Sequence, residues 1–139
     1  MATSTSLGDL SEAGAGARGS VVLYLRLEGL VIALATFALY ARTGANWWLF
    51  LLWPLPDLSM LGYLSRPCRG ARIYNAFHSY LLPAVLALSG LVLRAPLVVP
   101  LALIWINHIG IDRLLGFGLK YSDGFGYTHL GRIGGQKAQ

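Results

Sequence analysis

The sequence predicts an all-α protein, a bundle of four transmembrane helices with both termini in the cytoplasm. Two observations carry most of this prediction. Of 139 residues, 55% are hydrophobic and only 12% are charged, about half the charged share of an ordinary soluble domain. Four apolar stretches also have about the 20 residues that a helix needs to cross 30 Å of hydrocarbon. This composition excludes a disordered chain, and the single cysteine excludes a disulfide scaffold.

The expected elements follow one another with short connections. Residues 1–20 are small and polar and predict a disordered leader. The spans are expected at 21–40, 46–64, 74–93 and 96–116, and they form a transmembrane domain over 21–117. A Gly- and aromatic-rich cytoplasmic tail covers 118–139. Lipid offers no water to unpaired backbone groups, so helices are the form in which these stretches can cross the membrane.

The second stretch contains an irregularity, Trp53-Pro54-Leu55-Pro56-Asp57. Each proline removes an amide donor. Two interpretations are open: a span that breaks and restarts near Asp57, as in the discontinuous helices of transporters, or a simple proline kink. Trp47, Trp48 and Trp53 are expected in an interfacial belt and on lipid-facing surface.

The basic residues indicate the orientation. Those before the first span, between the second and third, and after the fourth are Arg18, Arg66, Arg69, Arg72, Lys120, Arg132 and Lys137. The other side carries only Arg42 and Arg94. The positive-inside rule then places both termini in the cytoplasm of a multi-pass plasma-membrane protein. Because the basic residues are spread over several loops despite the net charge of +5, we expect no nucleic-acid partner.

The ionisable residues of the spans are expected to lie at similar depth in the cytoplasmic half, where each is costly unless it has a role. The candidate metal ligands are Glu28, Asp57, His78, His108, Asp112 and, from a tail that folds back, His129. His108 and Asp112 are four residues apart and share one helix face. The alternatives are hydrogen-bonded structural residues, headgroup-level polarity and, for His129, an interfacial tail.

Three functions are compatible with this pattern. The first is a metal-dependent membrane enzyme with a divalent ion (Fe, Mn or Zn) that acts on a lipid-like or amphiphilic molecule. The second is a non-catalytic membrane subunit in which the polar residues join helices. The third is a component of a small proton or cation transporter, which would work as an oligomer. The sequence indicates no particular catalytic residue.

Several motifs together resemble a known family. They are RLEG at 26–29, PDLSMLGY at 56–63, Tyr74-Asn75 with His78, HIGIDR at 108–113, GFGLKY at 116–121 and THLG at 128–131. In these segments the chain resembles a bacterial membrane family catalogued as domain of unknown function 4260. The resemblance implies a small multi-span membrane protein and implies no particular activity.

Overall fold

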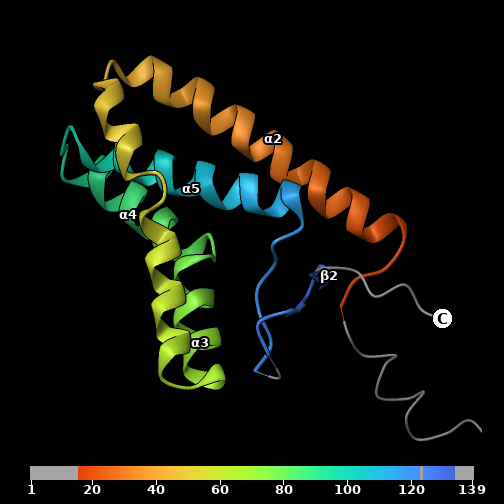
Figure 1. The fold of residues 1–139 in the computed structure, drawn as a ribbon. Coiled ribbons are helices and arrows are strands. Elements are labelled where there is room, and N and C mark those ends of the chain that lie inside the picture. The colour runs from red at the N-terminus through yellow and green to blue at the C-terminus, as the bar shows by residue number, and fades with distance from the viewer. Residues whose placement is uncertain (1–15, 123, 134–139) are drawn as a thin grey trace, which may run out of the picture.

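The structure is a computed structural model that describes residues 16–122 and 124–133 (Figure 1). Its elements are α2 (Ser20–Thr43), the 3-10 helices η1 (Trp47–Leu52) and η2 (Leu55–Leu64), α3 (Pro67–Phe77), α4 (Leu81–Val92), α5 (Val98–Leu115), β1 (Tyr127–Thr128) and β2 (Gly131–Arg132). The predicted helical class is confirmed, since the strands of the described residues are two residues long each. Most of the predicted leader, residues 1–15, lies outside the described residues.

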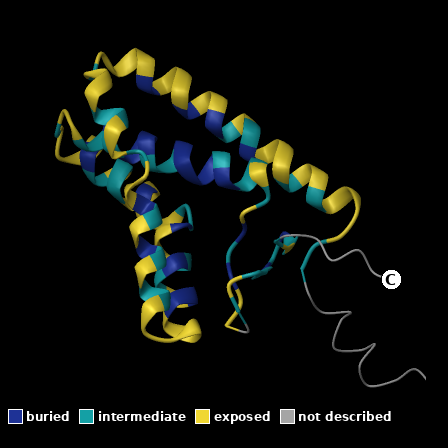
Figure 2. Ribbon diagram, viewed as in Figure 1, coloured by how far each residue is buried: buried dark blue, intermediate teal, exposed yellow. Residues whose placement is uncertain are grey.

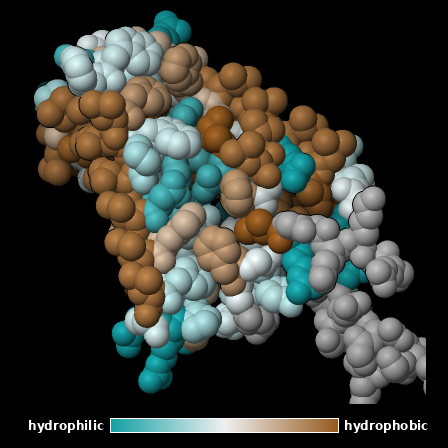
Figure 3. Space-filling model, viewed as in Figure 1, coloured by the Kyte–Doolittle hydropathy of each residue, from teal (hydrophilic) through white to brown (hydrophobic). Residues whose placement is uncertain are grey.

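Three helical segments are long and apolar enough to cross a membrane: Ser20–Thr43, Pro67–Val92 (α3 and α4 together) and Val98–Leu115. Their outer faces carry large exposed apolar side chains, including Val31 (65% exposed) and Leu88 (62%). Figure 2 shows exposed residues along the length of α2, and Figure 3 shows apolar surface over much of the face in view. Such a surface is incompatible with water and fits a lipid environment. The chain is therefore a membrane protein.

The second apolar stretch differs from the continuous span expected at 46–64. It forms η1 and η2, which are separated at Trp53 and Pro54, and it is not among the three helices that meet the length for a membrane crossing. The two prolines of this segment remove the amides that an α-helix would need. The Asp57 amide instead bonds the Pro54 carbonyl at 3.1 Å, three residues earlier. The broken-span interpretation is the one observed, and Asp57 lies in the first turn of η2.

The third span also differs from its expected bounds of 74–93. Its helix begins seven residues earlier, with Pro67 in the first turn of α3, and breaks after Phe77 before α4 starts at Leu81. Pro83 has no amide to donate to the carbonyl four residues before it, so the helix cannot continue unbroken through this point. His78 therefore stands at the C-terminal cap of α3, and this break decides where its side chain can point.

α5 is the central helix, packed against both α2 and α4, whereas η2 packs along α3 (Figure 1). The crossing of α2 and α5 is close because both helices place glycine at the contact. A Cβ on Gly29 would lie 2.7 Å from the Gly110 carbonyl oxygen. Asn107 Nδ2 donates across the same interface to the Ala33 carbonyl at 2.8 Å. Small residues and interhelical hydrogen bonds of this kind are what associate helices in lipid.

The tail returns to the helices. β1 and β2 pair in antiparallel fashion, and Ala17 N donates to the His129 carbonyl at 2.7 Å. The Asn75 side chain then holds the backbone of Lys120 from both sides. Its Nδ2 donates to the Lys120 carbonyl at 2.8 Å, and its Oδ1 accepts from the Lys120 amide at 2.7 Å. Asn75 thus fixes the tail to α3.

Replacing Asn75 with alanine is expected to release this attachment. Two hydrogen bonds of about 1 kcal/mol each are lost, so amides of 118–122 should exchange with solvent deuterium at least about ten-fold faster. Amides within α5 serve as the internal control and should keep their wild-type rates. Unchanged exchange in the tail would show that Asn75 does not hold it.

Candidate metal centre

Four ionisable side chains from three elements meet beside α5. Asp57 comes from the first turn of η2 and His78 from the C-terminal cap of α3. His108 and Asp112 come from one face of α5, as their spacing predicts. Each of the four, here called the His/Asp cluster, offers one ligand atom, and these atoms all lie within 4.8 Å of one another.

The distances between these atoms are nearly equal. His78 Nε2 lies 3.3 Å from His108 Nε2. Asp57 Oδ1 lies 3.4 Å from Nε2 of each histidine. Asp112 Oδ2 lies 3.4 Å from His78 Nε2 and 3.6 Å from His108 Nε2. Five edges of the four-atom figure thus fall between 3.3 and 3.6 Å.

Such edges are those of a tetrahedral metal site. The edge of a tetrahedron is about 1.63 times the distance from its centre to a corner, so metal–ligand bonds of about 2.0–2.2 Å imply edges of about 3.3–3.6 Å. Two imidazole nitrogens and two carboxylate oxygens also form a donor set that suits divalent transition metals. The cluster therefore has both the atoms and the spacing for one ion.

The hydrogen bonds of His78 determine which of its nitrogens faces the cluster. Its Nδ1 lies 3.1 Å from the Tyr74 carbonyl oxygen, which can only accept, so Nδ1 carries the proton. The Tyr74 ring stacks on the imidazole, with centroids 3.8 Å apart and planes 9° from parallel. A backbone carbonyl that orients a histidine in this way is the usual support for a metal-bound imidazole.

With the proton on Nδ1, His78 turns an acceptor toward the centre of the His/Asp cluster. Neutral His78 presents the lone pair of Nε2 to His108 Nε2 and to one oxygen each of Asp57 and Asp112. The Tyr74 hydroxyl donates to Asp112 Oδ2 at 3.5 Å, but the lone pair of His78 and the two carboxylate oxygens still repel one another, most strongly in a site with little solvent. A proton or a cation at the centre removes the repulsion, and a divalent cation also balances two carboxylates.

The cluster is closed on most sides and open at one ligand. His78 is 2% exposed, His108 0% and Asp112 9%, whereas the Asp57 side chain is 39% exposed. Four protein ligands would fill a tetrahedral coordination shell, so a water or substrate would have to add as a fifth ligand or replace one of the four. The exposed Asp57 is the side from which such a ligand could approach the ion.

Trp53 is part of the site's surroundings rather than of a lipid-facing belt. Its Nε1 donates to Asn107 Oδ1 at 3.1 Å, and its ring packs edge-to-face on His108 with centroids 4.5 Å apart. Trp47 and Trp48 are 54% and 73% exposed, as a surface belt requires. The sequence offered no sign of the contact between Trp53 and Asn107, because it joins two elements far apart in the chain.

The other two predicted ligands, Glu28 and His129, lie outside the His/Asp cluster. Both line a separate cavity on the α2 side of α5. His129 Nδ1 accepts from the Leu119 amide at 2.8 Å, and Arg113 Nη1 lies 2.6 Å from its Nε2. The tail folds back, as a role for His129 as a ligand required. It brings His129 to Arg113, however, and not to the His/Asp cluster.

Lys120 lies beside Tyr74, the residue that stacks on His78. It is 3% exposed, and its Nζ donates to the Phe125 carbonyl and lies over the rings of Phe125 and Tyr74. Burial lowers the pKa of this lysine to about 8, against an opposite effect of the Asp112 carboxylate. The spacing of residues in the sequence could not show that Lys120 lies near this site. It could show that Tyr74 does, because Tyr74 and His78 are four residues apart on one helix face.

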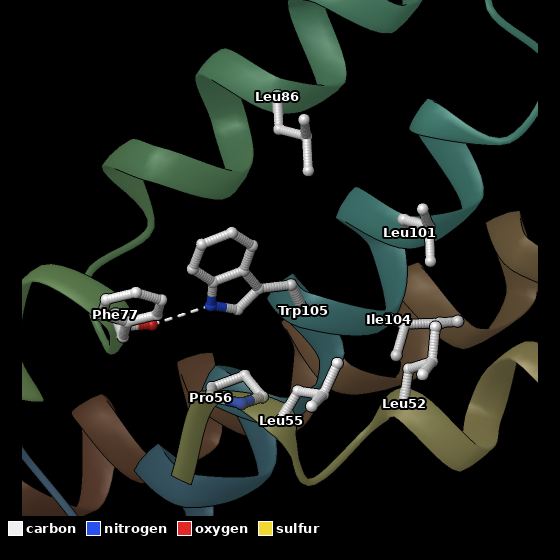
Figure 4. A pocket seen from close by; sticks show the side chains of 8 residues that line it. All are labelled: Leu52, Leu55, Pro56, Phe77, Leu86, Leu101, Ile104 and Trp105. Atoms are coloured by element: carbon white, nitrogen blue, oxygen red, sulfur yellow. Dashed lines mark hydrogen bonds between the residues drawn. The ribbon is translucent and has the colours of Figure 1, made fainter. Parts of the chain in front are cut away.

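An apolar cavity of about 220 Å³ is lined by residues of η1, η2, α3, α4 and α5 (Figure 4). Three of its lining residues, Pro56, Phe77 and Trp105, precede cluster members by one to three positions. The Trp105 indole donates to the Phe77 carbonyl at 2.7 Å. With this bond made, the cavity presents hydrocarbon almost throughout.

Residues 22–133 match the family described as Domain of unknown function (DUF4260). The chain belongs to this family. No curated protein and no solved structure matches it. The family match covers the helices and the returning tail together, so all four members of the His/Asp cluster lie within the matched segment.

Proposed function

We propose that the protein is a metal-dependent membrane enzyme that holds one divalent ion between Asp57, His78, His108 and Asp112. The observation that carries this proposal is the set of four ligand atoms in which five of the six edges measure 3.3–3.6 Å and the sixth is within 4.8 Å. Zn²⁺ prefers this geometry with nitrogen and oxygen donors, and Fe²⁺ and Mn²⁺ accept the same ligand types. The ion would act as a Lewis acid or activate a water at the exposed Asp57 side.

The substrate class that best suits the site is a lipid-like or amphiphilic molecule. Two features support it: the exposed apolar faces of the surrounding helices, and the apolar cavity whose lining residues Pro56, Phe77 and Trp105 lie close to cluster members in the sequence. That cavity exceeds the volume of about 150 Å³ in which a buried apolar pocket is known to bind a small hydrocarbon.

Metal analysis of the full chain tests the proposal. Protein purified in detergent without chelators is expected to contain about one Zn, Fe or Mn per chain, because two carboxylates and two neutral imidazoles bind such ions without further protein groups. The measurement is elemental mass spectrometry against protein concentration. Metal far below one per chain, and still absent after incubation with each ion, would contradict the proposal.

A further inference from the structure

A second polar cavity lies on the α2 side of α5. It has a volume of about 120 Å³ and is lined by Glu28, Tyr80, Arg113 and His129 together with the helix surface around Gly29. A bound water needs only about 10–15 Å³ of such space. The cavity therefore has room for a polyatomic ligand.

Tyr80 and Arg113 supply the cavity with hydrogen-bond donors. The Tyr80 hydroxyl is buried and has no hydrogen-bond partner among the described residues. The Arg113 guanidinium donates to the His78 carbonyl at 3.3 Å, and no carboxylate lies within ion-pair distance of it in the part of the chain that is described. An arginine that is partly buried, as Arg113 is, ordinarily has such a partner.

His129 adds a third donor. Its Nδ1 accepts the Leu119 amide, and burial and the positive charge of Arg113 both lower the pKa of its imidazole. A neutral ring then carries its proton on Nε2, which lies 2.6 Å from Arg113 Nη1. Arg113 Nη1 also lies 3.1 Å from the accepting Nδ1, and an acceptor beside Nε2 and the guanidinium would relieve the contact between the two donors.

From this arrangement, we infer that the cavity binds a phosphate oxyanion through Arg113, His129 and Tyr80. Guanidinium groups bind phosphate in a bidentate manner, and hydrogen bonds to a charged oxygen are stronger than those between neutral groups. The anion would satisfy the Tyr80 hydroxyl and balance Arg113. Inorganic phosphate and the headgroup of an anionic phospholipid share this chemistry.

The carboxylate of Glu28 is expected to weaken the binding of an anion in this cavity. Its carboxylate lines the same cavity from the exposed side of α2, and it has no ion-pair partner among the described residues. A negative group at the entrance repels an anion. Glu28→Gln is therefore expected to tighten binding, whereas a Glu28 that neutralised Arg113 would destabilise the protein when replaced.

The test compares two probes on the full chain in neutral detergent: inorganic phosphate at constant ionic strength, and phosphatidic acid against phosphatidylcholine. Binding is read as the ligand-dependent rise in melting temperature and as lipid retained in native mass spectra. Arg113→Gln should weaken binding at least about ten-fold. Arg69→Gln, which removes an exposed arginine of α3, should leave it unchanged.

Tyr80→Phe makes the experiment independent of folding defects in the Arg113 variant. Since the hydroxyl has no hydrogen-bond partner among residues 16–122 and 124–133, its removal should not lower the stability of the ligand-free protein, yet it should weaken anion binding about three- to ten-fold. A response to inorganic phosphate identifies a free anion, and a response to phosphatidic acid alone identifies a lipid headgroup. No response to either probe, or a response that Tyr80→Phe leaves at the wild-type level, would overturn the inference.

Discussion

Replacement of His108 with alanine is expected to remove the bound metal, with an affinity loss well beyond the 10- to 100-fold that follows from changing an outer-shell partner. His108 Nε2 lies 3.3–3.6 Å from all three other ligand atoms of the His/Asp cluster, so no single neighbour can take its place. The measurement is metal content per chain, followed by a competition titration with a chromophoric chelator.

His129→Ala is the matched control for this variant. It also removes an imidazole, but His129 lies in the tail after β1, outside the His/Asp cluster. It should keep the wild-type metal content. If His108→Ala retained metal, or if His129→Ala lost it equally, the ion would not be bound by the four residues proposed here.

The second large effect is expected at the crossing of α2 and α5. A Cβ on Gly110 would lie 2.9 Å from the Gly29 carbonyl oxygen and 3.0 Å from the Ala33 amide nitrogen. Both are backbone atoms, so they cannot move aside as a flexible side chain would. Gly110→Ala should force the two helices apart and lower the free energy of unfolding by about 1–3 kcal/mol.

Unfolding in mixed detergent, followed by circular dichroism, measures this difference. Gly126→Ala is a suitable control because the nearest atom to its new Cβ, the Ile133 carbonyl oxygen, is 3.8 Å away, and it should unfold as the wild type does. Equal stability of Gly110→Ala and wild type would mean that the helices do not cross at this point.

The sequence could predict the parts of the candidate site that depend on spacing within one helix, but not those that depend on how the helices pack. Depth along a helix follows from the rise of 1.5 Å per residue, and the spacing of His108 and Asp112 placed them on one face of α5 in advance. The direction in which α2 presents Glu28 depends on which face of α2 packs against α5. That face carries Gly29, Ala33, Thr36 and Tyr40, so Glu28 points to a different cavity.

The breaks in the helices were only partly predictable. Pro54 and Pro56 indicated an irregular second stretch, and the structure resolves it into η1 and η2. The break after Phe77 was not expected, although Pro83 contributes to it. Both breaks matter for the site, since they present Asp57 and His78 to α5 from the ends of elements rather than from a continuous helix face.

The scarcity of charge and the length of the apolar stretches determined the class of this protein, because about 20 apolar residues cross lipid as a helix whose backbone groups are paired within it. The residue types of the candidate site were determined in the same way, since ionisable groups in apolar spans stand out against their surroundings. The tertiary structure decided which of these groups meet. Proximity between η2, α3 and α5 depends on backbone breaks and on glycine contacts between helices, and these act between residues far apart in the chain.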